Sequence, residues 1–453
     1  MADMIGLPTF YLRTFGCQMN EHDSERLHGL LAAEGLTRVA SPEEAGIIVY
    51  NTCSVREKAE TRLLGHLGTA RRLKAQDAGR LVVVAGCVAQ SWGEGLLKEQ
   101  PHVDVLVGPQ SLAELPRLLR DRIVHRTRGA ALAESSSVFS ADLPRVRRAG
   151  PTAWVQIMTG CTNFCSYCVV PFVRGPEISR AASDIIVEVE DLVRDGVREI
   201  TLLGQNVNAY GREPGFNGTQ DFGELLWRLA DIPGLARLRF MTSHPKDVSP
   251  QLIEALAACP VVCRHLHLPA QSGSDRILKA MRRGYTRSQY VDLVGRLRAA
   301  SPQLALTTDL IVAFQGETED DFQDTLSLVR DCAYETAFTF IYSPRPHTAA
   351  AALPGCVSHD TARRRMEELI ALVQEQSAEM NSRLVGSTQE IMVEGESEDG
   401  TVWGRTGTYK MVHAAMGTAA VPPPGTILDV TVQSATSATL KGTVVEAGAA
   451  ASD

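Results

Sequence analysis

Gly160-Cys161-Thr162-Asn163-Phe164-Cys165-Ser166-Tyr167-Cys168 is the stretch that decides how the surrounding chain is read, because its three cysteines are spaced four and then three residues apart. Three thiolates from one short loop can hold three irons of a [4Fe–4S] cluster and leave the fourth iron open to a reactant. A zinc ion is the alternative to the cluster as the group that these cysteines bind. Structural zinc needs four closed ligands, however, and the next downstream histidine is the distant His244.

The CxxxCxxC spacing, with the aromatic Tyr167 before the last cysteine, resembles that of radical S-adenosylmethionine enzymes. The resemblance implies that Cys161, Cys165 and Cys168 hold a [4Fe–4S] cluster whose open iron binds S-adenosylmethionine. It also implies that the reduced cluster cleaves this cofactor to a 5′-deoxyadenosyl radical. We therefore expect the loop to lie at the centre of a catalytic domain.

Length and composition limit the class of protein. The chain has 453 residues, 44% of them apolar, which is enough for two or three packed cores. We find neither a secretory leader nor an apolar run of about 18 residues, so we expect a cytoplasmic protein without a membrane segment. Ten cysteines would stay reduced there and favour metal binding. The net charge of -8 argues against general binding of polyanions.

In the first part of the chain, three apolar strands each run into a cysteine. They are Thr9–Gly16 before Cys17, Gly46–Thr52 before Cys53, and Leu81–Gly86 before Cys87. The helical stretches between them predict a doubly wound parallel sheet over residues 7–123. Ligands of such sheets bind beyond the carboxyl ends of the strands, so we expect the three cysteines to converge on a second [4Fe–4S] cluster. Three unrelated buried cysteines are the alternative.

Residues 124–150, rich in Ala, Ser, Pro and Arg, have the composition of a linker. Strand and helix then alternate six times over residues 151–383. The predicted strands are Trp154–Met158, Ile200–Leu203, Leu238–Thr242, His265–Leu268, Leu306–Val312 and Ala337–Tyr342. Six units are too few for an eightfold barrel, which predicts a partial (βα)6 TIM barrel of the radical S-adenosylmethionine type, with its chemistry at the carboxyl ends of the strands.

Polar loops follow several of these strands and are expected to line one mouth. Each loop alone could be a hydrogen-bonded turn, and a turn is the favoured explanation for His244 or His267 alone. Taken together, about half of the loops should contact cofactor or substrate. The expected contacts to S-adenosylmethionine are Tyr167, Gly204, Gln205, Asn206, His267, Gln271 and Asp309.

Residues 384–447 read as short strands separated by Gly, Pro and Asp, including Glu390–Val393, Leu428–Val432 and Thr439–Val444. This pattern predicts a small β-barrel. The stretch Trp403–His413 resembles the TRAM domain, which implies contact with RNA. We expect Arg405, Tyr409 and Lys410 to make it, the tyrosine by stacking. A purely structural barrel is the alternative.

Taken together, the chain resembles the methylthiotransferases over nearly its whole length. The stretches that carry the resemblance are Thr14–Asn20, Asn51–Ala59, Cys168–Gly175, Leu203–Gly211 and Thr242–Pro245. The resemblance implies methylthiolation of carbon 2 of N6-isopentenyladenosine beside the tRNA anticodon. It also implies two S-adenosylmethionine molecules per turnover and a sulfide carried by the cluster on Cys17, Cys53 and Cys87.

Three residues depart from the family pattern. Ala313 and Gln315 replace Gly and Pro in one loop, and His347 replaces Gly in another. Sister families that modify a ribosomal-protein aspartate or threonylcarbamoyladenosine are the alternatives within this chemistry. A non-catalytic iron–sulfur or zinc RNA-binding protein is the alternative outside it. Beyond tRNA, we expect a flavodoxin-type electron donor, a separate sulfur donor and a monomer.

Overall fold

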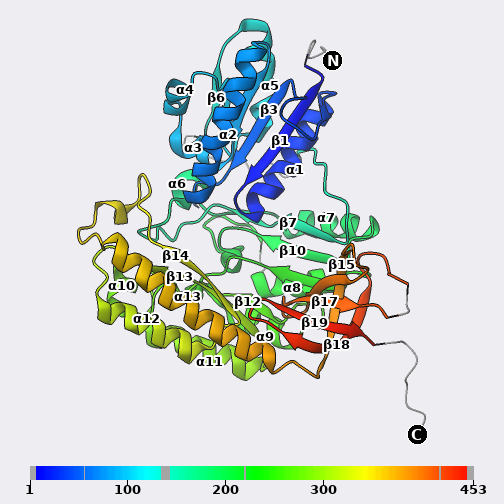
Figure 1. Ribbon diagram of the computed structural model, residues 1–453, viewed down its shortest axis with the longest axis vertical. Helices are drawn as coiled ribbons and strands as arrows, with labels where there is room; N and C mark the ends of the chain where they lie inside the picture. The colour runs from blue at the N-terminus through cyan, green and yellow to red at the C-terminus, as the bar shows by residue number, and fades with distance from the viewer. Residues whose placement is uncertain (1–6, 56, 134–142, 219–220, 418–419, 446–453) are drawn as a thin grey trace. The chain divides into compact units, whose positions relative to one another are not determined.

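The computed structural model describes residues 7–55, 57–133, 143–218, 221–417 and 420–445. Arg56, the predicted linker residues Ser135–Ser137 and residues 446–447 of the last predicted domain lie outside this range. The described chain packs as two compact units (Figure 1). The sheet unit comprises the described parts of 1–148, 158–180 and 343–351, and the barrel unit those of 149–157, 181–342 and 352–453. Among the described helices, none is long and apolar enough to cross a membrane.

The sheet unit is built on one parallel sheet in the order β2-β1-β3-β4-β5-β6. Its strands are β1 (Thr9–Phe15), β2 (Thr37–Arg38), β3 (Ile47–Thr52), β4 (Leu81–Ala85), β5 (Val105–Val107) and β6 (Gly129–Ala131). The predicted doubly wound sheet is therefore confirmed. Strands β2, β5 and β6 were not predicted, and β6 lies inside the stretch predicted as a linker.

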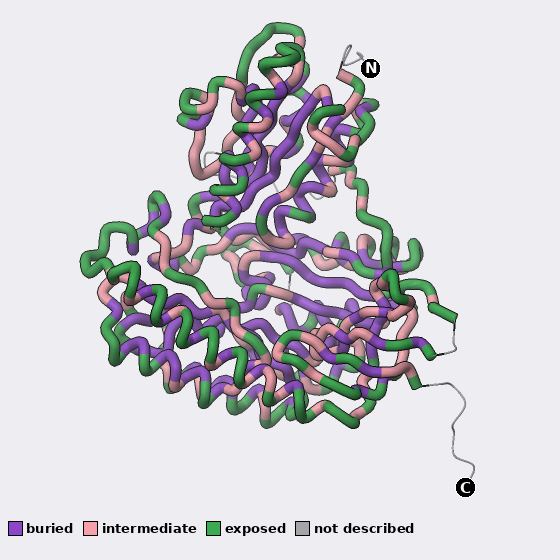
Figure 2. The backbone as a smooth tube through the Cα atoms, viewed as in Figure 1, coloured by how far each residue is buried: buried purple, intermediate pink, exposed green. Residues whose placement is uncertain are grey.

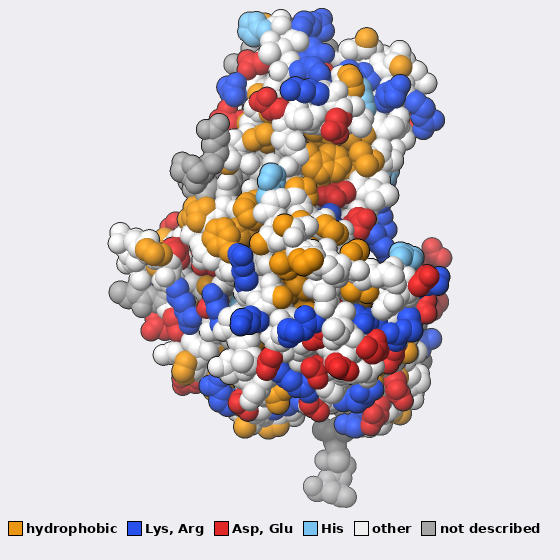
Figure 3. Space-filling model, turned by 90° about the vertical axis from the view of Figure 1, so that its left-hand side faces the viewer, with side chains coloured by type: hydrophobic (Ala, Val, Ile, Leu, Met, Phe, Trp, Pro, Cys, Tyr) orange, Lys and Arg blue, Asp and Glu red, His pale blue; other side chains and the backbone are white. Residues whose placement is uncertain are grey.

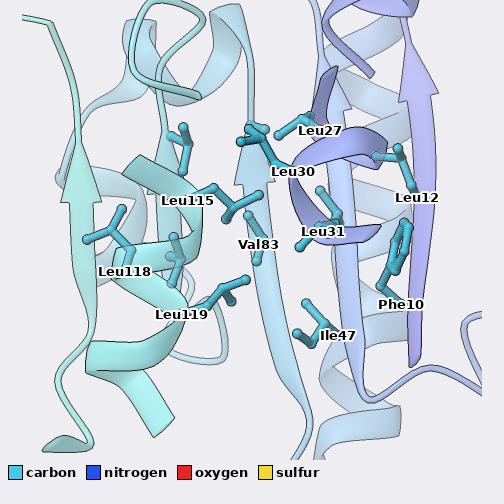
Figure 4. Close-up of a cluster of buried hydrophobic side chains, with 14 of the residues drawn as sticks. Phe10, Leu12, Leu27, Leu30, Leu31, Ile47, Val83, Leu115, Leu118 and Leu119 are labelled. Carbon is cyan, nitrogen blue, oxygen red and sulfur yellow. The ribbon is translucent and has the colours of Figure 1, made fainter. Parts of the chain in front are cut away.

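Helices cover both faces of this sheet. One face packs against α1 (Gln18–Ala33) and α5 (Leu115–His125), with Leu31 and Leu119 in the shared core (Figure 4). The other packs against α2 (Glu57–Gln76), α3 (Cys87–Trp92) and α4 (Gly95–Glu99). Successive residues of β3 alternate between the two cores: Ile47 belongs to the first and Ile48 to the second. A strand buried on both faces needs this continuous apolar sequence.

The barrel unit contains six parallel strands in two sheets, ordered β7-β10-β11 and β12-β13-β14, joined by a bridge between Leu238 and Val262. The strands are β7 (Thr152–Gln156), β10 (Glu199–Leu203), β11 (Arg237–Phe240), β12 (His265–His267), β13 (Ala305–Val312) and β14 (Thr336–Ile341). The helices that follow them are α7 (Ala182–Arg194), α8 (Phe222–Ala230), α9 (Pro250–Ala258), α10 (Asp275–Ala280), α11 (Arg287–Ala300), α12 (Glu319–Cys332) and α13 (His359–Ser382). The partial barrel is confirmed. Strands β10 to β13 are mainly buried, whereas the last strand, β14, is largely exposed, and so are the outer faces of the helices (Figure 2).

The last strands close into a small barrel in the order β15-β16-β17-β19-β18, as predicted. They are β15 (Thr388–Glu396), β16 (Val402–Thr406), β17 (Met411–Ala415), β18 (Ile427–Ala435) and β19 (Thr439–Val444). At Gly404 a side chain is excluded, because a Cβ there would lie 1.9 Å from the backbone oxygen of Met392. Strands β16 and β17 both come from the stretch that resembles the TRAM domain.

Candidate active site

Cys17, Cys53 and Cys87 lie side by side at one edge of the sheet. Each follows the carboxyl end of a strand, and the three strands β1, β3 and β4 are direct neighbours. The register pairs Phe15 with Thr52 and Asn51 with Ala85, so the three strands end at the same level. Cys17 caps α1, and Cys87 begins α3. Parallel pairing alone thus brings together three cysteines that are far apart in sequence.

Two glycines make this convergence possible. Gly16 has φ +143°, and a Cβ there would lie 2.4 Å from the Cβ of Cys53. Gly86 has φ +89°, and a Cβ there would lie 2.3 Å from Oδ1 of Asn51. Both contacts are shorter than any side chain tolerates, and both backbones adopt a conformation that favours glycine. The glycine before each of these two cysteines is therefore required by the close approach of neighbouring loops.

A buried polar network supports the cysteines from behind. Asn20 and Asn51 are fully buried, and Nδ2 of Asn51 donates to the backbone oxygen of Asn20 at 2.7 Å and to Oγ of Ser24 at 3.0 Å. Oδ1 of Asn20 accepts from the Cys17 thiol at 3.3 Å. Buried amides with satisfied partners hold a loop in one conformation. The sequence assigned no role to these residues, although Asn20 and Asn51 both stand in the stretches that resemble the family.

Arg174 is the buried cation of this site. Its Nη2 lies 2.6 Å from Oδ2 of Asp23, and its Nε donates to Sγ of Cys87 at 3.3 Å. The side chains of Arg174 and Asp23 are only 4% and 2% exposed, so both charges depend on each other. Arg174 ends α6 (Val170–Arg174), the helix that follows Cys168, and α6 packs on α3 through Val169, Val173 and Cys87.

The thiol chemistry of this trio fits a group that binds thiolates. The hydrogen bond with Cys53 lowers the pKa of Cys17 to about 6, and the charge of Arg174 acts in the same direction. The same hydrogen bond raises the pKa of Cys53, and burial raises that of Cys87. Thiolates are the form of cysteine that ligates metals, and a nearby cation stabilises them. The buried guanidinium of Arg174 thus lowers the pKa of the Cys17 and Cys87 thiols against the opposing effect of burial, which favours the thiolate form that an iron–sulfur cluster binds.

The CxxxCxxC loop lies in the same sheet unit, between β8 (Met158–Thr159) and α6. Cys165 is buried, whereas Cys161 and Cys168 are partly exposed. The backbone N–H of Cys161 donates to the oxygen of Gly175 at 3.0 Å, and that of Cys168 donates to Cys165 at 3.0 Å. Gly160, at φ +77°, leaves no room for a side chain, because a Cβ would lie 1.8 Å from the oxygen of Pro176. The loop is thus a tight turn that presents three cysteines.

The barrel mouth brings together some of the predicted S-adenosylmethionine contacts. His267 lies 3.5 Å from Asp309, through Nε2 and Oδ1, and its Nδ1 is 3.0 Å from Oγ1 of Thr307. The backbone N–H of Gln271 donates to the oxygen of Asp309 at 2.9 Å. Three of the predicted residues therefore form one group, with the unpredicted Thr307 as their partner.

The loop after β10 forms a second group in the mouth. Nδ2 of Asn206 donates to Asp247 at 2.8 Å, while its buried Oδ1 has no hydrogen-bond partner among the described residues. Gly204 accepts a hydrogen bond from Thr242, and Gln205 lies between them in the same loop. An unpaired buried acceptor is what a ligand donor such as an amino group would satisfy. Tyr167 belongs to the sheet unit and not to this group.

Two of the three residues predicted to contact RNA, Tyr409 and Lys410, contact side chains of the partial barrel instead. Tyr409 stacks on His265 at 5.0 Å and lies between the guanidinium groups of Arg239 and Arg405. Lys410 pairs with Glu335 and lies 2.7 Å from Oδ1 of Asn381, and Arg405 pairs with Glu394. On the face shown in Figure 3, Lys and Arg side chains are interspersed with Asp and Glu. Tyr409 and Lys410 thus attach the small barrel to the partial barrel, whereas Arg405 pairs within the small barrel. Contact of all three residues with RNA stays a prediction.

Comparisons with known proteins agree with the three-part organisation. Family models match residues 9–108 (uncharacterized protein family UPF0004), 155–329 (radical SAM superfamily) and 382–445 (TRAM domain). The tRNA-2-methylthio-N(6)-dimethylallyladenosine synthase of Burkholderia multivorans is 45% identical over 96% of this chain and 96% of its own length. That of Bordetella bronchiseptica is 45% identical over 90% and 87%. The chain belongs to the tRNA-2-methylthio-N(6)-dimethylallyladenosine synthase family. The predicted resemblance to methylthiotransferases is thereby confirmed.

Solved structures of two radical S-adenosylmethionine enzymes have a fold similar to that of this chain. The radical S-adenosylmethionine methyltransferase TsrM from Kitasatospora setae, with cobalamin and a [4Fe-4S] cluster bound, matches with a TM-score of 0.57 and 14% identity over 76% of this chain and 74% of that one. The cobalamin-dependent radical enzyme OxsB matches with a TM-score of 0.51 and 14% identity over 72% and 52%. At such identities the likeness concerns the fold alone. The individual site residues and domain boundaries remain predictions for this member of the synthase family.

Proposed function

We propose that this protein methylthiolates carbon 2 of N6-isopentenyladenosine beside the anticodon of tRNA, using two [4Fe–4S] clusters and S-adenosylmethionine. The observation that supports this most is the pair of cysteine trios within one compact unit. Relatives that carry the synthase name match nearly the whole chain. The three-cysteine groups provide two separate places for clusters, as a reaction that both inserts sulfur and activates a carbon requires.

The target bond explains the need for this chemistry. The hydrogen on carbon 2 of adenine is not removed by a side-chain base at neutral pH, so a proton-transfer mechanism fails. When bound, the clusters and S-adenosylmethionine would supply the one-electron chemistry, the sulfur and the methyl group. The target base lies in a single-stranded loop, so the enzyme can take it out of its stack without opening a duplex.

The roles of this chain's residues are binding and orientation. Cys161, Cys165 and Cys168 would hold one cluster. Cys17, Cys53 and Cys87 would hold the other, with Arg174 offsetting the charge of their thiolates. In the barrel mouth, Asn206, His267 and Asp309 would orient S-adenosylmethionine, and the unpaired Oδ1 of Asn206 would accept from its amino group. A flavodoxin-type electron donor, a separate sulfur donor, a cytoplasmic location and a monomeric state complete the proposal.

The test uses anaerobically reconstituted full-length protein with reductant and S-adenosylmethionine. We expect about eight irons per chain, as two cubane clusters require, release of 5′-deoxyadenosine, and methylthiolation of an isopentenylated anticodon stem-loop. A peptide from the ribosomal-protein substrate of the sister family, and a threonylcarbamoyladenosine stem-loop, should stay unmodified. A protein that binds RNA but releases no 5′-deoxyadenosine is a binding module and refutes the proposal.

A further inference from the structure

Three aromatic side chains next to the CxxxCxxC loop are exposed although their rings touch each other. Phe164 is 52% exposed and Phe172 46%, and His347 is exposed as well. The rings of Phe164 and Phe172 meet edge to face, with centroids 6.3 Å apart, and those of Phe172 and His347 are 6.2 Å apart. We call this group the aromatic platform. All three residues belong to the sheet unit.

Two members of the platform have a backbone conformation that is rare for their residue type. Phe164 has φ 45° and His347 has φ 66°, in the left-handed region that favours glycine. His347 stands where the family usually has glycine, so this chain keeps the glycine-like backbone and adds a ring. Among the described residues, the exposed rings of Phe164 and His347 gain only the two ring contacts given above, which offset little of this conformational cost. Such uncompensated strain is found at ligand sites.

The platform is fixed in place by its neighbours. Arg345 pairs with Glu60 at 2.7 Å and donates to the backbone oxygen of Val55 at 3.3 Å. The backbone N–H of Ala350 donates to the oxygen of Ser166, between Cys165 and Cys168, at 2.8 Å. The segment carrying His347 is therefore tied on one side to the helix after Cys53 and on the other to the CxxxCxxC loop. A preorganised surface binds with a smaller loss of entropy.

The chemistry of the platform favours an uncharged hydrocarbon group. The two phenyl rings offer neither a hydrogen-bond donor nor an acceptor, so the imidazole of His347 is the one polar ring of the three. Two arginines in the segments that carry Phe172 and His347, Arg174 and Arg345, are buried against Asp23 and Glu60, so neither guanidinium is presented to a phosphate. Binding of single-stranded RNA through its backbone normally needs such a cation beside the stacking ring.

We propose that the aromatic platform receives the isopentenyl group of the substrate adenosine. The inference rests on the proposed function, because that reaction brings this base to the CxxxCxxC loop. In adenine, carbon 2 and carbon 6 flank the same ring nitrogen, so the substituent on N6 reaches past the reacting carbon by only a few bonds. A hydrocarbon surface beside the loop is suited to hold it. Stacking of an unsubstituted neighbouring base is the competing occupant.

The test compares two anticodon stem-loops, one isopentenylated and one unmodified, by fluorescence anisotropy with reconstituted full-length protein. The variants are Phe172→Ala, Phe164→Ala, Phe172→Leu and His347→Gly. Trp227→Ala, which removes an aromatic ring that is 37% exposed on α8, is the matched control. Iron content and thermal melting of each variant establish that it is folded. Phe172→Leu keeps apolar bulk at position 172, and His347→Gly relieves the backbone strain at position 347.

We expect Phe172→Ala to weaken binding of the isopentenylated stem-loop on the order of tenfold, as for the loss of apolar contacts in a specificity pocket, and to leave the unmodified stem-loop within about twofold. Phe172→Leu should fall between wild type and Phe172→Ala, and Trp227→Ala should change neither. Equal loss for both RNAs means base stacking or loop support and overturns the proposal, as does an unchanged affinity. If wild type itself neither binds nor modifies the isopentenylated stem-loop, the proposed function fails first and the platform proposal falls with it.

Discussion

Removing the charge of Arg174 should destabilise the sheet unit far more than an ordinary arginine substitution. In Arg174→Met the Asp23 carboxylate, whose side chain is 2% exposed, stays buried without the guanidinium that lies 2.6 Å away. Breaking a buried ion pair in this way costs about 3–5 kcal/mol in free energy of unfolding. The lost hydrogen bond to Cys87 adds to this cost. A loss of this size lowers the folded-to-unfolded ratio by roughly two to four orders of magnitude.

The fluorescence of Trp92 provides the assay. The chain has four tryptophans, and Trp92, in α3, is the one that lies in the sheet unit. Replacing Trp154, Trp227 and Trp403 by Phe leaves its fluorescence as a reporter during urea unfolding of the cluster-free chain, so iron binding does not contribute. Arg117→Met is the control, since that side chain is 56% exposed and pairs only with exposed acids; its cost should stay below about 1 kcal/mol.

The double variant Asp23→Asn/Arg174→Met separates charge burial from packing. If the uncompensated carboxylate is the cause, the double variant should regain part of the loss, with a coupling energy of about 1–3 kcal/mol. A cost of Arg174→Met equal to that of Arg117→Met would refute the reasoning. So would a double variant whose loss equals the sum of the two single losses.

Three further predictions concern the cysteine trios and the barrel mouth. Changing Cys17, Cys53 and Cys87 to Ala should lower iron from about eight to about four atoms per chain, measured by colorimetric iron assay; 5′-deoxyadenosine release should persist while methylthiolation stops, and unchanged iron would contradict the ligand assignment. Gly16→Ala should lose the same cluster, because its Cβ would lie 2.4 Å from that of Cys53, whereas Gly65→Ala, with open space around it, should keep full iron content. Burial lowers the pKa of His244 to about 2, whereas the unfolded value is about 6.5. The contribution of neutral His244 to stability is therefore present above pH 6.5 and lost as the pH falls. Between pH 7.5 and 5.5 this loss should lower the free energy of unfolding by about 1.4 kcal/mol. His244→Gln should abolish this pH dependence, whereas His359→Gln, at an exposed histidine, should not. An identical pH dependence in both variants, by urea unfolding, would count against this assignment.

The sequence predicted the architecture because each region has a clear pattern. Continuous apolar strands that end at cysteines indicated a parallel sheet, and six alternations of strand and helix indicated the partial barrel. The short strands β5 and β6 were missed, since three residues are too few to show a period and β6 lies in a stretch with linker composition. Of the four cysteines outside the two trios, which no motif includes, Cys259, Cys263 and Cys332 are buried and Cys356 is exposed.

Contacts between distant segments could not be predicted in this way. Arg174 stands in a stretch that resembles the family, but its pairing with Asp23 depends on how α6 packs on α3, which no local pattern records. Likewise, Tyr409 and Lys410 are of the residue types expected on an RNA-binding surface, but Tyr409 stacks on His265 and Lys410 pairs with Glu335, both in the partial barrel. Side-chain type predicts what a residue can bind, whereas tertiary packing decides which partner reaches it first.

Two departures from the family pattern, Ala313 and His347, also depend on tertiary packing for their explanation. Ala313 has φ 59° and His347 has φ 66°, so both loops keep the conformation for which glycine is usual although this chain has lost the glycine. The two losses differ in consequence. Ala313 is buried, and its backbone N–H donates to Oε2 of Glu317 at 2.6 Å, so the surrounding structure repays the strain. His347 is exposed, and within the described part of the chain its side chain gains only a ring contact with Phe172. The strain at His347 is therefore the one that the proposed role of the aromatic platform in substrate binding would explain.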